Sequence, residues 1–212
     1  MELINLIILF FIYSFIGWFI EVLEGVINRK DLVNRGFLIG PLCPIYGFGA
    51  IIMIKILTKY QNNYLLVFLL GALICSLLEY FASLILEKIF NTRWWDYRDK
   101  KIHINGRICL EVMILFGIGS LVLMGIMNPI VSKVLLLPDK VKIIMCIVMI
   151  VLFLIDITFT IKVIIDMKKE NLIENKDITK TLNKRVKEKV KDKYLVKRLL
   201  NSFPLLKSKT RH

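Results

Sequence analysis

The sequence is poor in the residues that enzymes most often use for metal binding and redox chemistry. It contains two histidines and four cysteines in 212 residues. The cysteines stand far apart, without CxxC spacing or an adjacent histidine, which argues against a zinc site and a redox pair. We interpret them as small apolar side chains of the interior: Cys43, Cys75, Cys109 and Cys146. We therefore expect no metal and no cofactor.

Motifs for catalysis and for ATP binding are also missing. The chain has no Walker A pattern, no HExxH motif and no Ser/His pairing, and His103 stands alone. We expect that it is not an enzyme and that it does not itself hydrolyse ATP. No aromatic interleaving of basic residues suggests nucleic-acid binding, so we expect no nucleic-acid partner.

Charge is scarce over five long stretches, and these decide the fold class. The chain is 57% hydrophobic with a mean hydropathy of +0.66, too apolar for an ordinary soluble domain. A membrane-spanning helix needs about 20 mostly apolar residues. The second candidate is short and would require Lys55 and Lys59 to snorkel. We predict an all-α, polytopic transmembrane bundle with these five spans: Leu3–Ile27, Ile45–Lys59, Tyr64–Leu86, Ile108–Met127 and Val141–Ile165.

Positive charge is concentrated at the end of the chain. Residues 167–212 hold 15 Lys/Arg and five Asp/Glu, a net +10 of the total +13. The positive-inside rule places this tail in the cytoplasm, and five spans then place the N-terminus outside. We divide the chain into a transmembrane domain, 1–166, and a basic cytoplasmic tail, 167–212. The tail is either an amphipathic helix on anionic lipid or partly disordered.

Acidic residues interrupt the apolar spans. Each ionisable group at mid-membrane costs about 2.5–3.5 kcal/mol, so these side chains should face protein or water. Small and polar residues at helical spacing accompany them, among them Ala72, Cys75, Glu79 and Ser83. We predict one polar cluster near the inner leaflet, either fixing helix packing or lining a polar pathway or solute site: Glu21, Glu24, Arg35, Glu79, Arg107 and Glu111.

Glycine and proline gather in one segment, "NRGFLIGPLCPIYGFG", between the first two spans. Irregular backbone at membrane depth is tolerated only where protein or a cavity satisfies it. We interpret the segment as an ordered, re-entrant loop that carries Arg35 to the acids, with an exposed loop as the alternative. Its structural residues are Asn34, Gly36, Gly40, Pro41, Pro44, Tyr46, Gly47 and Gly49. In the inward loop Asn91–Arg107, we expect Trp95, Asp96 and Tyr97 at the headgroup level.

Several motifs together resemble a bacterial membrane-protein family, the CmpB or "type IV" group of putative ABC-transporter permeases. They are Gly17-Trp18 with Glu21, the glycine- and proline-rich segment, Glu79, "WDY" at Trp95–Tyr97 and "NGRICLE" at Asn105–Glu111. In the family pattern we expect a small polar residue after "WDY", and Arg98 departs from this pattern. The resemblance implies transport across the bacterial cell membrane, energised by a separate ATP-binding subunit that docks on inward loops such as Asn91–Arg107.

Three functions remain open from the sequence. The first is a permease component of an ABC-type transport system. The second is a non-transporting scaffold or sensor whose basic tail binds anionic membrane lipid. The third is an intramembrane enzyme acting on lipid, since carboxylates and an arginine near the headgroups suit acid–base chemistry, although no nucleophile motif supports it.

Overall fold

The structure is a computed structural model, and it describes residues 2–29, 37–90 and 93–169. Helices dominate these residues, with one small two-stranded sheet, which confirms the all-α fold class. The elements in chain order are α1 (Glu2–Arg29), α2 (Pro44–Leu57), η1 (Thr58–Tyr60), α3 (Tyr64–Phe90), β1 (His103–Ile104), β2 (Ile108–Cys109), α4 (Leu110–Val122), η2 (Leu123–Met127), α5 (Asn128–Val131), η3 (Ser132–Leu136) and α6 (Asp139–Lys169). The predicted tail lies almost entirely outside the described residues.

Four helical stretches are long and apolar enough to cross a membrane: Glu2–Ile27, Tyr64–Ile89, Leu110–Leu136 and Asp139–Lys162. They correspond to the first, third, fourth and fifth spans predicted from the sequence. At most 33% of the residues in any of these apolar windows are buried, which suits helices that face lipid on one side. The chain is therefore a multi-pass membrane protein.

The third of these stretches changes its helical geometry as it proceeds. It begins as α4, continues through the π-helical turn η2 and ends in the short α5 and the 3₁₀ helix η3. Pro129 lies just after the π turn. A proline inside a helix lacks an amide donor and clashes with the carbonyl four residues earlier, so a local change of helical pitch is expected beside it.

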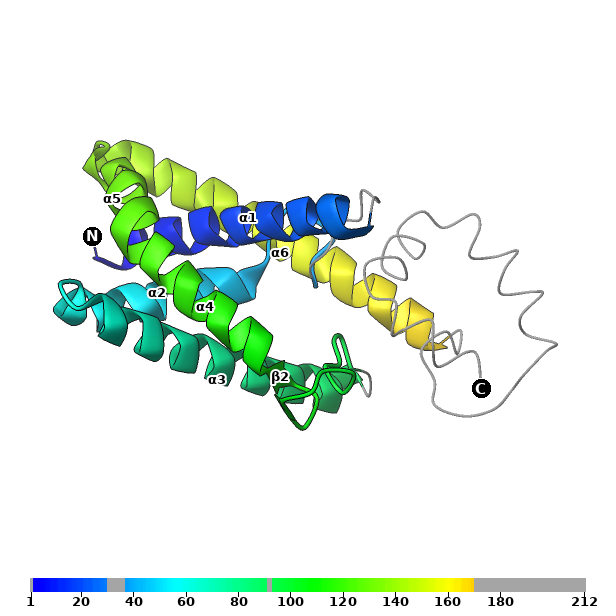
Figure 1. Cartoon of the computed structure of the whole chain (residues 1–212). Helices are drawn as coiled ribbons and strands as arrows, with labels where there is room; N and C mark the ends of the chain where they lie inside the picture. The colour runs from blue at the N-terminus through cyan, green and yellow to red at the C-terminus, as the bar shows by residue number, and fades with distance from the viewer. Residues whose placement is uncertain (1, 30–36, 91–92, 170–212) are drawn as a thin grey trace.

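The second predicted span consists of two different segments. Helix α2 has 14 residues and so extends about 21 Å, less than the roughly 30 Å of the hydrocarbon core. The non-helical segment Phe37–Cys43 leads into it from the end of the bundle where α1 finishes (Figure 1). The two segments together return the chain from the end of the bundle where α1 finishes to the opposite end, where α3 begins (Figure 1).

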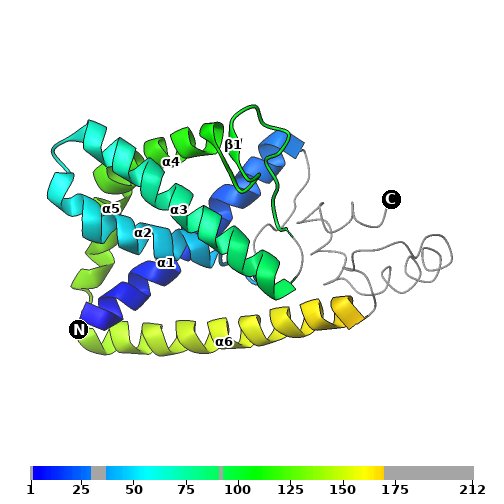
Figure 2. The same ribbon diagram turned by 90° about the horizontal axis from the view of Figure 1, so that it is seen from below.

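Helix α6 lies along one edge of the bundle, where Figure 2 shows it beside the start of α1. Its first half packs on α1: the Cys146 thiol donates to the Ile4 carbonyl, and the rings of Phe11 and Phe153 meet edge to face. Farther along, α6 faces the non-helical segment. The carboxylate of Asp156 accepts hydrogen bonds from the Gly40 amide at 2.9 and 3.0 Å.

Two further amides of the non-helical segment are also satisfied by the protein. The Ile39 amide donates to the hydroxyl of Thr160 at 3.1 Å, and the Cys43 amide donates to the Ser14 carbonyl at 2.9 Å. Leu38 is fully buried between these contacts. Pro44 then opens α2 at its first turn, where no amide donor is needed. Of the predicted loop residues, Asn34, Arg35 and Gly36 lie outside the described residues.

Close helix approach in the bundle depends on glycine. A Cβ placed on Gly71 of α3 would lie 2.2 Å from the Cβ of Ser120 on α4. A Cβ on Gly119, one residue earlier on α4, would meet nothing within 4 Å. The two glycines therefore offer a comparison between a helix contact and a lipid-facing position.

We predict opposite effects for Gly71→Ala and Gly119→Ala on thermal unfolding of the purified protein in detergent. Alanine favours a helix interior over glycine by about 1 kcal/mol, so Gly119→Ala should keep or raise the melting temperature. Gly71→Ala should lower it, because the new methyl group forces α3 away from Ser120. Equal melting temperatures for the two variants would contradict the close approach of α3 and α4.

Candidate functional site

Two carboxylates and two tyrosines meet inside the bundle, and we call them the carboxylate–tyrosine cluster: Glu21, Tyr46, Glu79 and Tyr97. The Tyr46 hydroxyl donates to Glu21 Oε1 at 2.5 Å, and the Tyr97 hydroxyl donates to Glu79 Oε1 at 2.9 Å. Each residue comes from a different part of the chain: α1, α2, α3 and the loop after α3. The cluster therefore joins the helices to the loop.

Glycine makes room for this arrangement on α1. A Cβ on Gly17 would lie 2.2 Å from Cγ of Tyr46, so the tyrosine ring occupies the space that a side chain would fill. This contact fixes Tyr46 one helical turn from Glu21, where its hydroxyl reaches the carboxylate. The motif Gly17-Trp18 with Glu21 thus has a physical reason. Gly17 leaves space for the Tyr46 ring, and Glu21 accepts a hydrogen bond from the Tyr46 hydroxyl.

Glu79 is the most deeply buried acid of the cluster. It is 8% exposed, and its Oε2 has no hydrogen-bond partner among the described residues. One turn earlier on the same face, Ser76 is 2% exposed and its hydroxyl also has none within the described chain. An unsatisfied neutral donor or acceptor costs about 1–3 kcal/mol, and a buried ion costs several more. These two atoms are among the buried polar atoms that lack a hydrogen-bond partner within the described residues.

The charges of Glu79 and Glu21 both affect the pKa of Tyr97, which lies in the loop after α3. Burial is the largest effect that raises the pKa of the Tyr97 hydroxyl well above its usual range, followed by the charge of Glu79 and its hydrogen bond. The charge of Glu21 adds a smaller effect in the same direction. Tyr97 therefore stays a neutral hydrogen-bond donor to the cluster.

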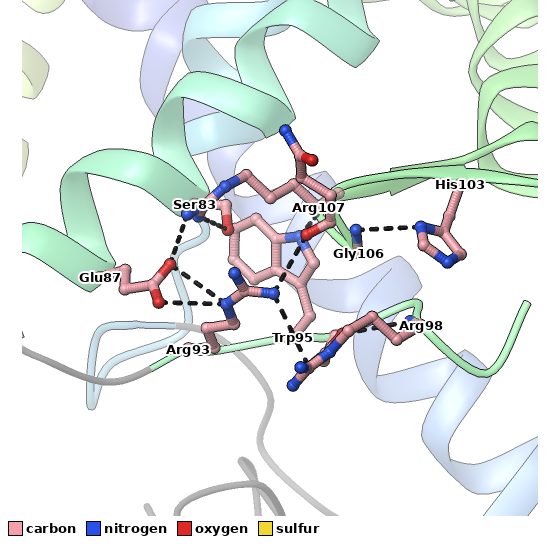
Figure 3. A network of polar contacts seen from close by, with 10 residues as sticks. Ser83, Glu87, Arg93, Trp95, Arg98, His103, Gly106 and Arg107 are labelled. Atoms are coloured by element: carbon pink, nitrogen blue, oxygen red, sulfur yellow. Dashed lines mark hydrogen bonds and ion pairs between the residues drawn. The ribbon is translucent and has the colours of Figure 1, made fainter.

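A second polar group lies nearer the end of the bundle, and we call it the ion-pair chain: Arg107, Glu87, Arg93, Asp96 and Arg98. Figure 3 labels Arg107, Glu87, Arg93 and Arg98. Arg107 Nη2 lies 2.5 Å from Glu87 Oε2, and Arg107 Nη1 donates to the Ser83 hydroxyl at 3.0 Å. Arg93 Nε bonds to both oxygens of the same Glu87 at 3.1 and 3.2 Å. One carboxylate thus joins α3 to both sides of the loop.

The ion-pair chain continues outward through Asp96. Arg93 Nη1 lies 3.8 Å from Asp96 Oδ2, and Arg98 Nε donates to the same oxygen at 2.7 Å. Burial alone would raise the pKa of Asp96, but hydrogen bonds from Arg98 and the charges of Arg98 and Arg93 lower it. Arg98, the departure from the family pattern, is here an exposed partner of Asp96.

A tight hairpin positions Arg107. Asn105 and Gly106 have φ values of 53° and 67°, and the Arg107 amide donates to the Ile104 carbonyl at 3.0 Å. Positive φ at both central residues defines a type I′ turn, for which Asn-Gly is a favoured sequence. The Trp95 side chain connects the first part of the loop to this turn, because its Nε1 donates to the Arg107 carbonyl at 3.0 Å. The Arg107 side chain is thereby turned inward, where it is 8% exposed as a residue.

The structure divides the single predicted cluster into two groups. Glu21 and Glu79 belong to the carboxylate–tyrosine cluster, whereas Arg107 bonds to Ser83 and Glu87, farther along α3. Glu111 does not bond to Arg107: it is exposed and pairs with Lys100 at 2.6 Å. Glu24 is half-buried on α1. Arg35 lies outside the described residues.

Other predicted positions take more specific roles than the sequence suggested. Tyr46 and Tyr97 were expected as a loop residue and an interfacial residue, and both are donors to acids. Trp95 donates to the hairpin at Arg107, and Asp96 accepts hydrogen bonds from Arg98. Glu87 was missed, although its signal was present. It follows Glu79 and Ser83 at steps of four, which places all three on one face of α3.

Comparison with known proteins adds the family. Residues 8–161 match the family model described as "Putative ABC-transporter type IV". The chain belongs to this family. No curated protein and no solved structure matches it.

Membership of the putative ABC-transporter type IV family confirms the resemblance stated from the motifs. The matched residues include the carboxylate–tyrosine cluster, the ion-pair chain and the contacts of Asp156 and Thr160. Together with the apolar helices, the family makes this chain a multi-pass membrane protein of transporter type.

We predict that Arg107→Ala destabilises the protein by about 1–3 kcal/mol, because the buried Ser83 hydroxyl loses its charged donor and Glu87 keeps only Arg93 of its two guanidinium partners. Chemical unfolding in detergent measures this change. Lys100→Ala is the matched control, since it breaks a solvent-exposed ion pair in the same loop and should change stability little. Equal losses in the two variants would show that the inward arginine is not special.

Proposed function

We propose that this chain is the membrane-spanning permease subunit of an ABC-type transport system in a bacterial cell membrane. The observation that carries the proposal is the family match over residues 8–161, which includes the bundle and the hairpin. The chain has no Walker A pattern, so the proposal requires a separate ATP-binding subunit. It assigns no catalytic reaction to this chain.

The hairpin of β1 and β2 offers the docking surface for that subunit. Ile102 and Ile104 are 62% and 54% exposed, and two exposed apolar side chains two residues apart form a small apolar surface on this loop. Two exposed basic residues, Arg98 and Lys101, precede them in the same loop. An apolar centre with a charged rim is the usual composition of a protein–protein contact.

The ion-pair chain makes this surface rigid. Glu87 ties the hairpin's Arg107 and the preceding Arg93 to α3, so a force on the hairpin is transmitted to a membrane-spanning helix. The Tyr97–Glu79 hydrogen bond extends the same connection deeper into the bundle. A subunit that binds and hydrolyses ATP would act on the helices through these contacts. With the N-terminus outside, this end of the bundle faces the cytoplasm, where ATP is available.

The proposal predicts that the full-length protein, cross-linked in its native membrane and purified, brings with it a protein that contains a Walker A motif. Ile104→Lys should weaken this association by about tenfold, equivalent to roughly 1.4 kcal/mol, because a charge replaces the apolar centre of the surface. Quantitative mass spectrometry of the purified complex measures the ratio of the two subunits.

Leu136→Lys is the control for this experiment. Leu136 is 84% exposed and lies in η3, at the opposite end of the bundle from the hairpin (Figure 1). This variant should retain the partner. Absence of any Walker A protein from the purified complex, or equal loss of the partner in both lysine variants, would refute the proposal.

A further inference from the structure

We propose that Glu79 is a proton-binding site within the membrane: its carboxyl group carries a proton at neutral pH while it accepts a hydrogen bond from Tyr97. Three observations support this assignment: the burial of the side chain, the orphaned oxygen and the composition of its surroundings. The inference goes beyond the proposed function, because the site would bind a proton whether or not the protein transports a solute.

The hydrogen bonding of Glu79 suits a neutral acid. An ionised carboxylate accepts hydrogen bonds at both oxygens, and buried carboxylates need such partners. Only Oε1 of Glu79 receives one among the described residues, from a tyrosine, which is a neutral donor. A proton on Oε2 removes the buried charge and leaves a single unsatisfied O–H group, which is the smaller penalty.

The negative charge that faces Glu79 from α1 favours the proton as well. Glu21 on α1 contributes negative charge, which opposes a second carboxylate ion nearby. Arg107 directs its hydrogen bonds to Ser83 and Glu87 instead of Glu79. Among the described residues, the other titratable groups that interact with Glu79 are neutral when protonated: Tyr46 on α2, Cys75 on α3 and Tyr97 in the loop. Of these, the hydrogen bond from Tyr97 favours the ionised form, so it opposes the effects of burial and of Glu21.

A proton explains the site better than a metal ion does. Metal cations in proteins are held by several ligand atoms that converge on one point. Within the described residues no group of three or more His, Cys, Asp or Glu side chains could hold a metal ion. Glu79 and Glu21 instead accept hydrogen bonds from two different tyrosines.

Infrared difference spectroscopy of the full-length protein in lipid vesicles tests the assignment, since a protonated carboxyl has its own carbonyl stretching band. We expect this band at neutral pH in the wild type, its loss as pH is raised, and its absence from Glu79→Gln. Tyr97→Phe should keep the band but move it to higher frequency, because the carbonyl oxygen loses its hydrogen-bond donor. Glu111→Gln, at an exposed acid, should leave the band unchanged.

The melting temperature of Glu79→Gln controls for folding. Glutamine resembles the neutral acid in shape and charge, so the variant should unfold at the wild-type temperature at neutral pH. A wild-type spectrum without a protonated carboxyl at neutral pH would overturn the proposal. So would a band that persists in Glu79→Gln, or one that changes with sodium or potassium concentration at constant pH.

Discussion

The arrangement of this bundle depends on satisfying backbone amides where the chain crosses the membrane without being helical. Lipid supplies no hydrogen-bond partners, so the segment Phe37–Cys43 is stable only where protein groups accept its amides. Asp156 and Thr160 provide acceptors for Gly40 and Ile39. An acid in an otherwise apolar helix is thereby explained without a transport role. The same hydrogen bonds connect the later part of α6 to the segment Phe37–Cys43, whereas the first part of α6 packs on α1.

Helix composition predicted most of this fold, because long apolar runs admit few alternatives in a membrane. The second crossing differs from the others because it is only partly helical. Its sequence predicted a helix from Ile45 to Lys59, and the structure begins α2 at Pro44 and ends it at Leu57. The preceding glycines and prolines correctly indicated non-helical backbone. What the sequence could not show is the acceptor for that backbone, since Gly40 and Asp156 are 116 residues apart.

The polar residues were harder to pair than to find. Helical spacing correctly placed Glu79 and Ser83 on one face of α3, and the same spacing extended to Glu87. Depth then decided the partners, because each step of four residues along α3 moves about 6 Å along the axis. Arg107 reaches Ser83 and Glu87 but not Glu79, which meets Tyr97 instead. Where Arg107 points follows from the left-handed turn at Asn105 and Gly106, a local feature with a recognisable sequence signal.

The ion-pair chain and the carboxylate–tyrosine cluster lie at different depths and therefore differ in physical character. The ion-pair chain lies at the end of the bundle, where Arg98 and Glu87 retain contact with solvent, so its charges are compensated both by partners and by water. The carboxylate–tyrosine cluster lies deeper, and its most buried acid, Glu79, accepts its hydrogen bond from the neutral hydroxyl of Tyr97. Tyr97 and Arg107 belong to one loop, so a displacement of the hairpin would change the hydrogen bond of a buried acid and an ion pair together. A rigid hairpin is therefore sufficient to couple the exposed loop surface to the buried Glu79.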